Sequence, residues 1–569
     1  MRTLRRRTLF KYGAAAGGAA MIAPWLSKTP FANAAGGGTL TKYLEHVPLP
    51  GRGIVVATPR GVQPGLTTYA FTQTEIARQL HPQLPPTPLW AYDDGSGLAG
   101  QAGSFGMAIV ARTGTPLQID FTNRLPRRYP SWIPVDTRLT PLGDAVRVMT
   151  HLHGGFVAAA SDGNPAVTPN GFGFGETQRV VYPNESPQQP ATLLWFHDHG
   201  MGTTRLNVFA GLAAAYLIRD EYDTGGPDNA NGLPSGAYEI PLVIQDRQFE
   251  PDGTLLYPRS PIAGVTWIGE YFGDVMLVNG KVWPYLDLEP RLYRFRILNG
   301  CNARILNLDM GGARIWQIGA EGGMWTRPVA VKRIVLAPAE RADLLVDFSQ
   351  LAGMTSQLKN LPLPPGVSNP GPQLTQVMQF RVADATPFVS VVPTQLVGGR
   401  DADLPAPSRK RFITLNEVDV DTEDWILTLS GQPFTDPSTE TPSAGTIEDW
   451  YYINLTGDTH PMHPHLVTHQ VVGRVPFDVD AYIDAAGEGP YGVRGGVDPT
   501  LFATGPMLPA DPTERGYKDT VKANPGTFTI IRAKFELPSG VQAPQRYVHH
   551  CHIVEHEDND MMRPFDVIA

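Results

Sequence analysis

A stretch near the C-terminus reads Tyr547-Val548-His549-His550-Cys551-His552-Ile553-Val554-Glu555-His556-Glu557-Asp558-Asn559-Asp560-Met561-Met562. The β-branched and aromatic residues around its His-Cys-His core predict an extended strand. Because side chains on a strand alternate between its two faces, Cys551 is expected on one face, with His550 and His552 on the other. One tripeptide would therefore serve two sites.

The Cys551 face offers most of the ligands of an electron-transfer copper site. His556 and Met561 follow at spacings that suit the set of histidine, cysteine thiolate and weak axial methionine used by blue-copper centres, although a second histidine is still needed. On the other face, His550 and His552 would lie roughly 6–7 Å apart, which suits two neighbouring metal ions better than one. The covalent path from Cys551 to its neighbours would carry electrons between the two sites.

Length and composition predict a multidomain β protein. The chain has 569 residues, which exceeds one ordinary domain and favours three or four. Its hydrophobic content of 42%, with 59 Gly and 54 Pro, is typical of a globular, turn-rich protein.

Three segments repeat one pattern, an alternating strand that ends in asparagine: 116–123, 291–299 and 447–454. Their domain-sized separation predicts three copies of one β-sandwich unit. Polar, Gly- and Pro-rich runs at 223–236 and 404–410 read as linkers. We therefore expect domains at 35–222, 223–400 and 401–569.

The N-terminus predicts export. Arg5-Arg6-Arg7 precedes an uncharged run that is too short to span a bilayer, and Ala32-Asn33-Ala34 resembles a cleavage signal. We predict a twin-arginine signal peptide at 1–34, use of the twin-arginine machinery, and an extracellular, cell-wall-associated or periplasmic location without a stable membrane anchor. Its removal lowers the Lys plus Arg count from 46 to 40 against 55 acidic residues, a net charge of −15 that disfavours nucleic acid as a partner.

The histidines are unevenly placed, because none of the fourteen lies between residues 200 and 459. One His-x-His pair is weak support for a metal site, but four pairs are hard to reach by accident. Ten histidines fall in four clusters: His151 and His153; His197 and His199; His460, His463 and His465; His550, His552 and His556.

The first and third domains match further. His197-Asp198-His199 aligns with His550-Cys551-His552, so Asp198 stands where the thiol is. Three residues before His151 is Val148, where the third domain has His460. The first domain thus lacks blue-copper ligands, and His460 supplies the missing imidazole in the third.

These motifs resemble those of the three-domain multicopper oxidases. Stretches such as Leu277–Tyr285, Thr203–Val208 and Gly516–Thr520 are most similar to the bacterial spore-coat-type laccases and bilirubin oxidases. The resemblance implies three cupredoxin-like Greek-key β-sandwich domains, four copper ions, and oxidation of small donors coupled to reduction of O₂ to water. By motif it implies these ligands: type 1, His460, Cys551, His556 and axial Met561; type 2, His151 and His463; type 3, His153, His197 and His552 on one ion, and His199, His465 and His550 on the other.

Reduction of O₂ to water consumes protons, so acids near the cluster are needed. Asp162 and Glu557 match positions to which the family assigns proton delivery, although Asp162 in Ser161-Asp162-Gly163 also fits a simple turn. His469 and His549 are close to ligands but out of register, and we expect roles behind the ligands or at the surface.

The leading hypothesis is a monomeric oxidase of phenols, aromatic amines or bilirubin-like donors. A metal oxidase acting on Cu(I), Mn(II) or Fe(II) is less favoured, because the fourteen methionines are scattered rather than clustered. A non-enzymatic coat or copper-storage protein would not need a thiolate linked to paired histidines. The middle domain is expected to form a wall of the donor site through 361–372, together with 478–516.

Overall fold

The computed structural model describes residues 40–97, 107–262, 264–421 and 424–569. The predicted export signal lies outside these ranges. Within them, no helix combines the length and the apolar character that a membrane span requires.

The first part of the chain forms two sheets. One has the order β1 (Leu49–Pro50), β2 (Gly53–Val56), β6 (Met107–Arg112), β11 (Ala213–Arg219), β10 (Thr192–Asp198) and β8 (Thr150–His153). The other has the order β3 (Gly61–Gln63), β4 (Leu66–Arg78), β7 (Leu117–Asn123) and β9 (Thr177–Tyr182), with β5 (Thr87–Asp93) paired to β4.

The middle part forms two more sheets. The larger runs β14 (Lys281–Val282), β13 (Val275–Val278), β12 (Glu239–Arg247), β16 (Leu292–Asn299), β21 (Arg341–Asp347), β18 (Arg314–Ala320) and β19 (Gly323–Val331). The smaller runs β15 (Tyr285–Leu288), β23 (Gln376–Val382), β22 (Thr355–Asn360), β17 (Leu306–Asp309) and β20 (Ile334–Leu336).

The last part repeats this arrangement. Its larger sheet runs β25 (Asp424–Leu429), β24 (Arg409–Asp421), β26 (Ile447–Asn454), β33 (Thr527–Lys534), β28 (His469–Pro476) and β31 (Leu508–Pro509). Its second sheet runs β32 (Val521–Ala523), β27 (His460–Pro464), β34 (Gln545–Cys551) and β35 (Met562–Val567), and β29 (Glu488–Gly489) pairs with β30 (Gly492–Val493).

In the part of the chain that the structure describes, helices are short and lie between strands. They are α2 (Ala159–Asp162), α3 (Thr204–Ala210), α4 (Val479–Ala486) and α5 (Val554–Asp558), with 3-10 turns η2 (Gly236–Tyr238), η3 (Ser349–Leu351), η4 (Pro499–Phe502) and η5 (Pro512–Glu514). The predicted all-β class is therefore confirmed.

The three asparagine-terminated segments occupy equivalent places. β7, β16 and β26 each pair in parallel with one strand, β4, β12 or β24, and antiparallel with another, β9, β21 or β33. The closing asparagines, Asn123, Asn299 and Asn454, are buried, and each side-chain oxygen accepts the backbone N–H two residues on. Such a turn ends the strand without leaving the N–H unsatisfied, which explains why the pattern ends in asparagine.

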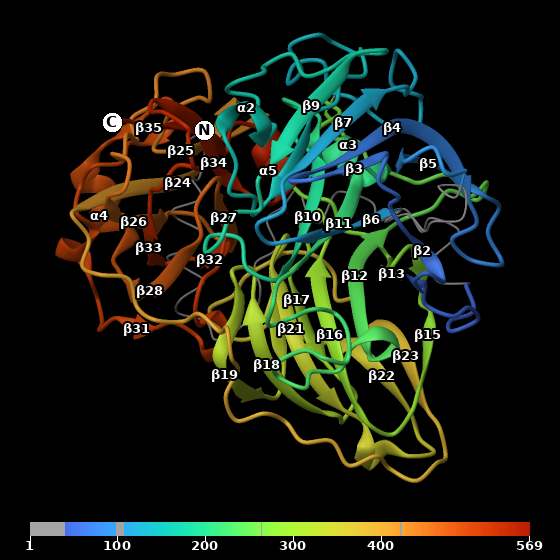
Figure 1. The fold of residues 1–569 in the computed structure, drawn as a ribbon. Helices are drawn as coiled ribbons and strands as arrows, with labels where there is room; N and C mark the ends of the chain where they lie inside the picture. Colours follow the sequence, from blue (N-terminus) through green and yellow to red (C-terminus); the bar gives the residue numbers. More distant parts are fainter. Residues whose placement is uncertain (1–39, 98–106, 263, 422–423) are drawn as a thin grey trace.

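The parts pack closely against each other. Figure 1 shows the last part beside the first, with the middle part below both. One hydrophobic core includes Phe196 and Ile218 of the first part and Ile240 and Phe295 of the middle part, so the two share buried apolar surface. Asp223, where a linker was expected, is itself buried and pairs with Arg294 and Arg296. The boundaries near 222 and 400 remain predictions.

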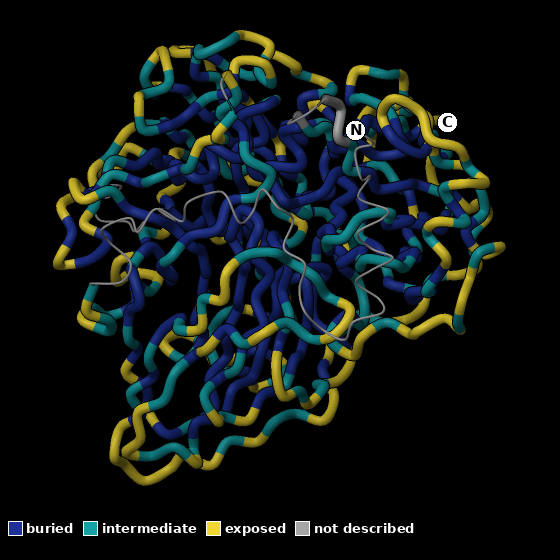
Figure 2. The backbone as a smooth tube through the Cα atoms, turned by 180° about the vertical axis from the view of Figure 1, so that it is seen from behind, coloured by how far each residue is buried: buried dark blue, intermediate teal, exposed yellow. Residues whose placement is uncertain are grey.

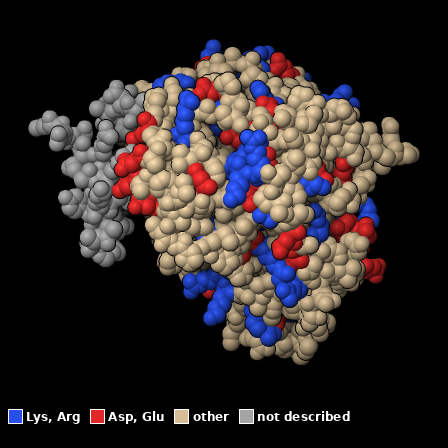
Figure 3. Space-filling model, turned by 90° about the vertical axis from the view of Figure 1, so that its left-hand side faces the viewer, with Lys and Arg blue, Asp and Glu red and all other residues tan. Residues whose placement is uncertain are grey.

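Burial and charge follow the sheets. Exposed residues lie mainly in loops, while strand centres are buried (Figure 2). On the face drawn in Figure 3, basic and acidic side chains are interspersed.

Candidate metal centre

Two pairs of strands bring eight histidines together. In the first part, β8 and β10 run antiparallel and place His151 opposite His197. In the last part, β27 and β34 do the same for His463 and His550. The two pairs face each other, since the ring centroids of His151 and His465 lie 3.9 Å apart. The cluster holds all eight predicted residues: His151, His153, His197, His199, His463, His465, His550 and His552.

The outer ring nitrogens are held by hydrogen bonds. The Nδ1–H groups of His151, His197 and His463 donate to the backbone oxygens of Asp162, Asp198 and Asp519, at 2.6, 2.8 and 2.7 Å. The Nε2 atoms of these three rings are buried without a hydrogen-bond partner. Fixing the proton on Nδ1 leaves the Nε2 lone pair free for a cation, because a neutral imidazole has one donor and one acceptor nitrogen.

His153 is oriented the other way round. Its Nε2 lies 3.1 Å from both Asp519 Oδ1 and Thr520 Oγ1, while its Nδ1 is buried without a partner. His550 Nε2 lies 3.3 Å from His199 Nε2 and 3.2 Å from His465 Nε2. Lone pairs on two nitrogens at this distance repel each other. Orphaned nitrogens and facing lone pairs are the arrangement that bound cations resolve, so these residues fit a cluster of metal ions.

Burial favours the neutral form of six of the cluster imidazoles. Desolvation, then neighbouring imidazoles, holds the pKa of His197, His199 and His465 well below the ordinary range. The same holds for His153, His463 and His552. Neutral imidazole is the form that ligates transition metals.

Cys551 lies on the opposite side of β34, in a second constellation. Its Sγ is 3.5 Å from His460 Nδ1 and 3.7 Å from His556 Nδ1, and these two nitrogens are 3.3 Å apart. Met561 is fully buried in the same apolar cluster as Cys551, whereas Met562 packs with Val548. Burial lowers the pKa of His460 to about 4 and raises the pKa of the Cys551 thiol, so a metal ion would have to displace the thiol proton.

Two buried acids bridge histidines of different parts. Asp162, at the end of α2, accepts from Nδ1 of His465 at 2.8 Å through Oδ2, and its backbone oxygen accepts from His151. Glu557, in α5, lies 3.3 Å from Nδ1 of both His199 and His550. The hydroxyl of Thr204 donates to Glu557 at 2.7 Å. Each acid thus contacts one histidine from the first part and one from the last.

Comparison with known proteins agrees with this geometry. The sequence profile of the multicopper oxidase family matches residues 405–569. A laccase of Bacillus stratosphericus is 38% identical over 93% of this chain and 99% of its own length. The chain belongs to the multicopper oxidase family. A laccase of Bacillus subtilis is 37% identical over the same shares, and the McoA multicopper oxidase of Aquifex aeolicus superposes with a TM-score of 0.72 at 26% identity, covering 93% of this chain and all of that one.

As a multicopper oxidase the protein is a copper-dependent oxidoreductase that uses O₂, and its domains are cupredoxin-like. Other residues stand in the first part at the positions of the thiolate-site ligands. Asp198, in the place of Cys551, is buried and accepts backbone N–H groups of Met149 and Gly200. Val148, in the place of His460, is a buried apolar residue.

Two carboxylates beside the thiolate constellation escaped the sequence analysis. Glu270 Oε1 lies 3.7 Å from Nε2 of His556, and Glu417 Oε1 lies 3.8 Å from Nε2 of His460. Both side chains are largely buried, at 4% and 8% exposure. Neither residue stands in a histidine motif, so only the fold brings them to the outer edges of these rings.

The predicted wall segments differ in position. Segment 361–372 lies beside His460, because Ser368 exchanges hydrogen bonds with Thr459. Segment 478–516 packs against the last part, where Tyr482 meets Phe477 edge-on and Glu514 pairs with Arg474, and it touches the middle part where Gln317 donates to the backbone oxygen of Thr513. Closer to the constellation is Trp267, whose indole donates to the backbone oxygen of Glu555 at 2.9 Å.

His469 and His549 are both fully buried, so a surface role is excluded for each. His549 packs between Trp450 and Phe565. His549 lies on β34 itself and His469 lies on β28 of the larger sheet, so both are inside the last part.

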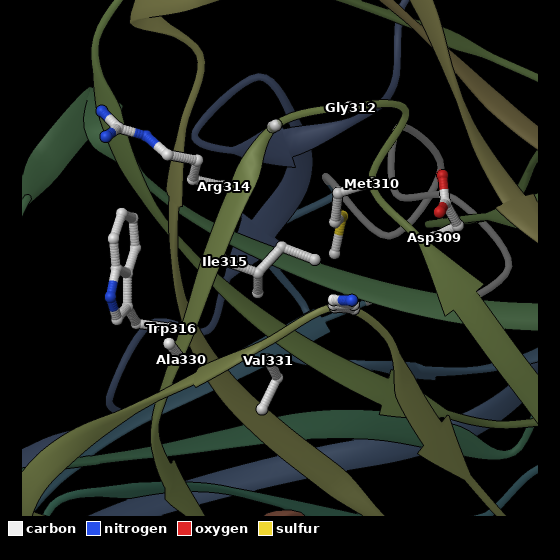
Figure 4. Close-up of a pocket in the computed structure, with 10 residues that line it drawn as sticks. Asp309, Met310, Gly312, Arg314, Ile315, Trp316, Ala330 and Val331 are labelled. Atoms are coloured by element: carbon white, nitrogen blue, oxygen red, sulfur yellow. The ribbon is translucent and has the colours of Figure 1, made fainter.

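A cavity of about 360 Å³ opens in the middle part (Figure 4). None of the candidate ligands lines it, so it is separate from both constellations. The lining residues are Asp309, Met310, Gly312, Ala313, Arg314, Ile315, Trp316, Ala330, Val331 and Lys332.

Proposed function

We propose that this protein is a laccase-type oxidase that holds four copper ions and couples one-electron oxidation of small aromatic donors to four-electron reduction of O₂ to water. The observation that carries the proposal is the His550-Cys551-His552 tripeptide. Its thiol lies beside two histidines, and Met561 belongs to the same apolar cluster, while the two imidazoles of the tripeptide belong to the eight-histidine cluster. A copper store would not need this covalent link between two sites.

The residues fit copper by donor chemistry. Thiolate, two imidazoles and a thioether suit a blue-copper site, and imidazole clusters suit the remaining ions. We assign His460, Cys551, His556 and Met561 to type 1 copper and His151 with His463 to type 2. The type 3 pair would take His153, His197 and His552 on one ion, and His199, His465 and His550 on the other.

Bound copper would supply the redox chemistry, and the chain would supply the electron-transfer path and the protons. The bonds from Cys551 Sγ through the backbone to His550 and His552 form the shortest covalent connection between the two constellations. Asp162 and Glu557 are ionisable groups beside the cluster histidines, where they would deliver the protons that reduction of O₂ consumes. Desolvation of the site favours delivery by these acids over delivery by bulk water.

Aromatic donors fit the surroundings of the type 1 residues. Trp267 and Phe272 belong to the same apolar cluster as Cys551 and Met561, and segment 361–372 adds a Pro-rich wall beside His460. Export by the twin-arginine route and a monomeric state belong to the same proposal. Mass spectrometry of the secreted protein would test the cleavage after Ala34.

Glu270 and Glu417 favour a second candidate, oxidation of a divalent metal ion. Carboxylate oxygens are preferred ligands of Mn(II) and suit Fe(II), and here they approach the imidazole edges that would receive the electron. A negative charge beside each ring would also attract a cation and stabilise oxidised type 1 copper.

A steady-state comparison on copper-loaded protein separates the candidates. A phenol, bilirubin, Mn(II) and Fe(II) would each be tested with wild type, Glu270→Gln and Glu417→Gln. An aromatic oxidase keeps kcat/KM for the phenol in both variants. If both variants lose at least tenfold in kcat/KM for a metal ion that wild type oxidises faster than any aromatic donor, the laccase assignment is wrong.

A further inference from the structure

The middle part contributes no histidine, yet one of its arginines reaches the cluster. Arg341, at the start of β21, is buried with 2% exposure. Its Nε donates to the backbone oxygen of Leu193 in β10 at 3.0 Å. Its Nη1 and Nη2 donate to the two carboxylate oxygens of Asp519 at 2.9 and 2.6 Å. One guanidinium therefore ties together the middle part, a histidine-bearing strand of the first part, and the last part.

Asp519 passes this connection to two histidines. Its Oδ1 lies 3.1 Å from His153 Nε2, and its backbone oxygen accepts from His463 Nδ1 at 2.7 Å. Because a carboxylate only accepts, the His153 proton must stay on Nε2, which leaves Nδ1 unprotonated toward the cluster. Asp519 thus contacts one histidine of the first part and one of the last part, as Asp162 and Glu557 do with other rings.

Local backbone structure accommodates the pair. Gly154, directly after His153, has a positive φ of 82°. A Cβ atom there would lie 2.4 Å from Asp519 Oδ2 and 3.1 Å from Arg341 Nη2. Glycine thus lets the ion pair pack directly against the chain that carries His153.

The fork of Arg341 suits this position better than a lysine would. The bidentate contact fixes the plane of the Asp519 carboxylate, and two further donors are used on Leu193 and on the backbone oxygen of Ala339 at 2.9 Å. Glu321 supports the arrangement by accepting the backbone N–H of Arg341 at 2.8 Å and an ammonium N–H of Lys518 at 2.7 Å.

We propose that Arg341 and Asp519 are positioning residues for the trinuclear copper cluster: the middle domain fixes the tautomer of His153 and the orientation of His463 through this ion pair. The inference rests on the proposed function, since it assumes that copper binds these histidines. Loss of such supporting contacts typically weakens metal binding by about 10–100-fold.

The test compares copper retention in holoenzyme variants. Wild type, Arg341→Gln, Arg341→Lys and Asp519→Asn would be purified with copper and challenged with a chelator, while total copper, the blue absorption and the type 2 electron paramagnetic resonance signal are followed. We expect Arg341→Gln to lose type 2 copper at about 10–100-fold lower chelator concentration than wild type, with the blue band retained. Arg341→Lys should lie between the two.

Arg411→Gln is a matched control, because Arg411 forms a buried bidentate pair with Glu448 in β24 and β26. It should lower thermal stability without selective loss of type 2 copper. The inference is overturned if Arg341→Gln keeps the copper content and spectra of wild type. It is also overturned if Arg341→Gln loses type 1 and type 2 copper together, without the selective loss of type 2 copper that sets it apart from Arg411→Gln. If Arg341→Gln does not fold, Asp519→Asn decides by the same readouts. Wild type that binds no copper would instead refute the proposed function.

Discussion

Asp162 offers the clearest way to separate proton delivery from support of a ligand. Its Oδ2 accepts from His465 Nδ1 at 2.8 Å and from the Asn164 amide at 2.8 Å. In Asp162→Asn, the remaining oxygen can accept the same two hydrogen bonds, so copper should be retained. The amide cannot act as an acid or base, and since a positioned acid contributes about 10²–10⁴ in rate, reoxidation by O₂ should slow by about that factor.

Asp162→Ala removes the acceptor as well. His465 Nδ1–H is then left buried and unsatisfied, at a cost of about 1–3 kcal/mol, which is roughly 5–150-fold in binding at 1.4 kcal/mol per tenfold. The alanine variant should therefore also lose cluster copper, whereas His151 keeps its bond to the backbone oxygen of residue 162. Copper analysis and anaerobic stopped-flow reduction, followed by mixing with O₂, measure the three effects separately. Unchanged reoxidation in Asp162→Asn, or equal slowing of donor oxidation, would refute this reasoning.

Four further outcomes are expected. Cys551→Ser should abolish the blue absorption and turnover while the cluster histidines still bind copper; a blue, active variant would contradict the assignment. Met561→Leu should raise the type 1 reduction potential in a spectroelectrochemical titration, and Met562→Leu should not, because a thioether stabilises oxidised copper and only Met561 shares the apolar cluster of Cys551. Copper-free protein should lose stability in denaturant titrations as the pH falls from 7 to 5. Burial lowers the pKa of His460 to about 4 and the pKa of His469 to about 3, so in this pH range mainly the unfolded chain binds these protons. This difference lowers the free energy of unfolding by about 2 kcal/mol per histidine at pH 5. An unfolding free energy independent of pH would exclude buried neutral histidines. Shortening 361–372 should change KM among aromatic donors and leave copper content intact; loss of copper instead would place that loop in the copper-binding structure.

Features that depend on local chemistry were predictable from sequence. The alternation of β34 placed Cys551 on the face opposite His550, because strand geometry allows nothing else. The repeat ending in Asn123, Asn299 and Asn454 was visible because the same turn needs the same side chain each time. Residue type and spacing thus carried both the fold class and the histidine clusters.

Features that depend on tertiary packing were not predictable. Glu270 and Glu417 reach His556 and His460 from a loop of the middle part and from β24, and no spacing rule connects them. Segment 478–516 was expected beside the donor site because it is long and irregular. Its contacts run through Tyr482 and Glu514 to the last part and through Thr513 to Gln317 of the middle part, and its role in a donor site stays a prediction.

The shared cluster explains why a domain without ligands is retained beside it. Histidines from the first and last parts meet at one interface, and imidazoles whose centroids stack at 3.7–3.9 Å, as His153 does on His463 and His151 on His465, tolerate little sliding between those parts. If only the first and last parts contacted each other, they could shift relative to one another, and each part would move its own histidine-bearing strands with it. Arg341 contacts both from a third part and adds an independent constraint on the same interface. Residues that support ligands in this way need a charge and a suitable position in space, but no fixed spacing from the ligands in the sequence. The ligand motifs are therefore visible in the sequence, whereas the supporting residues are visible only in the fold.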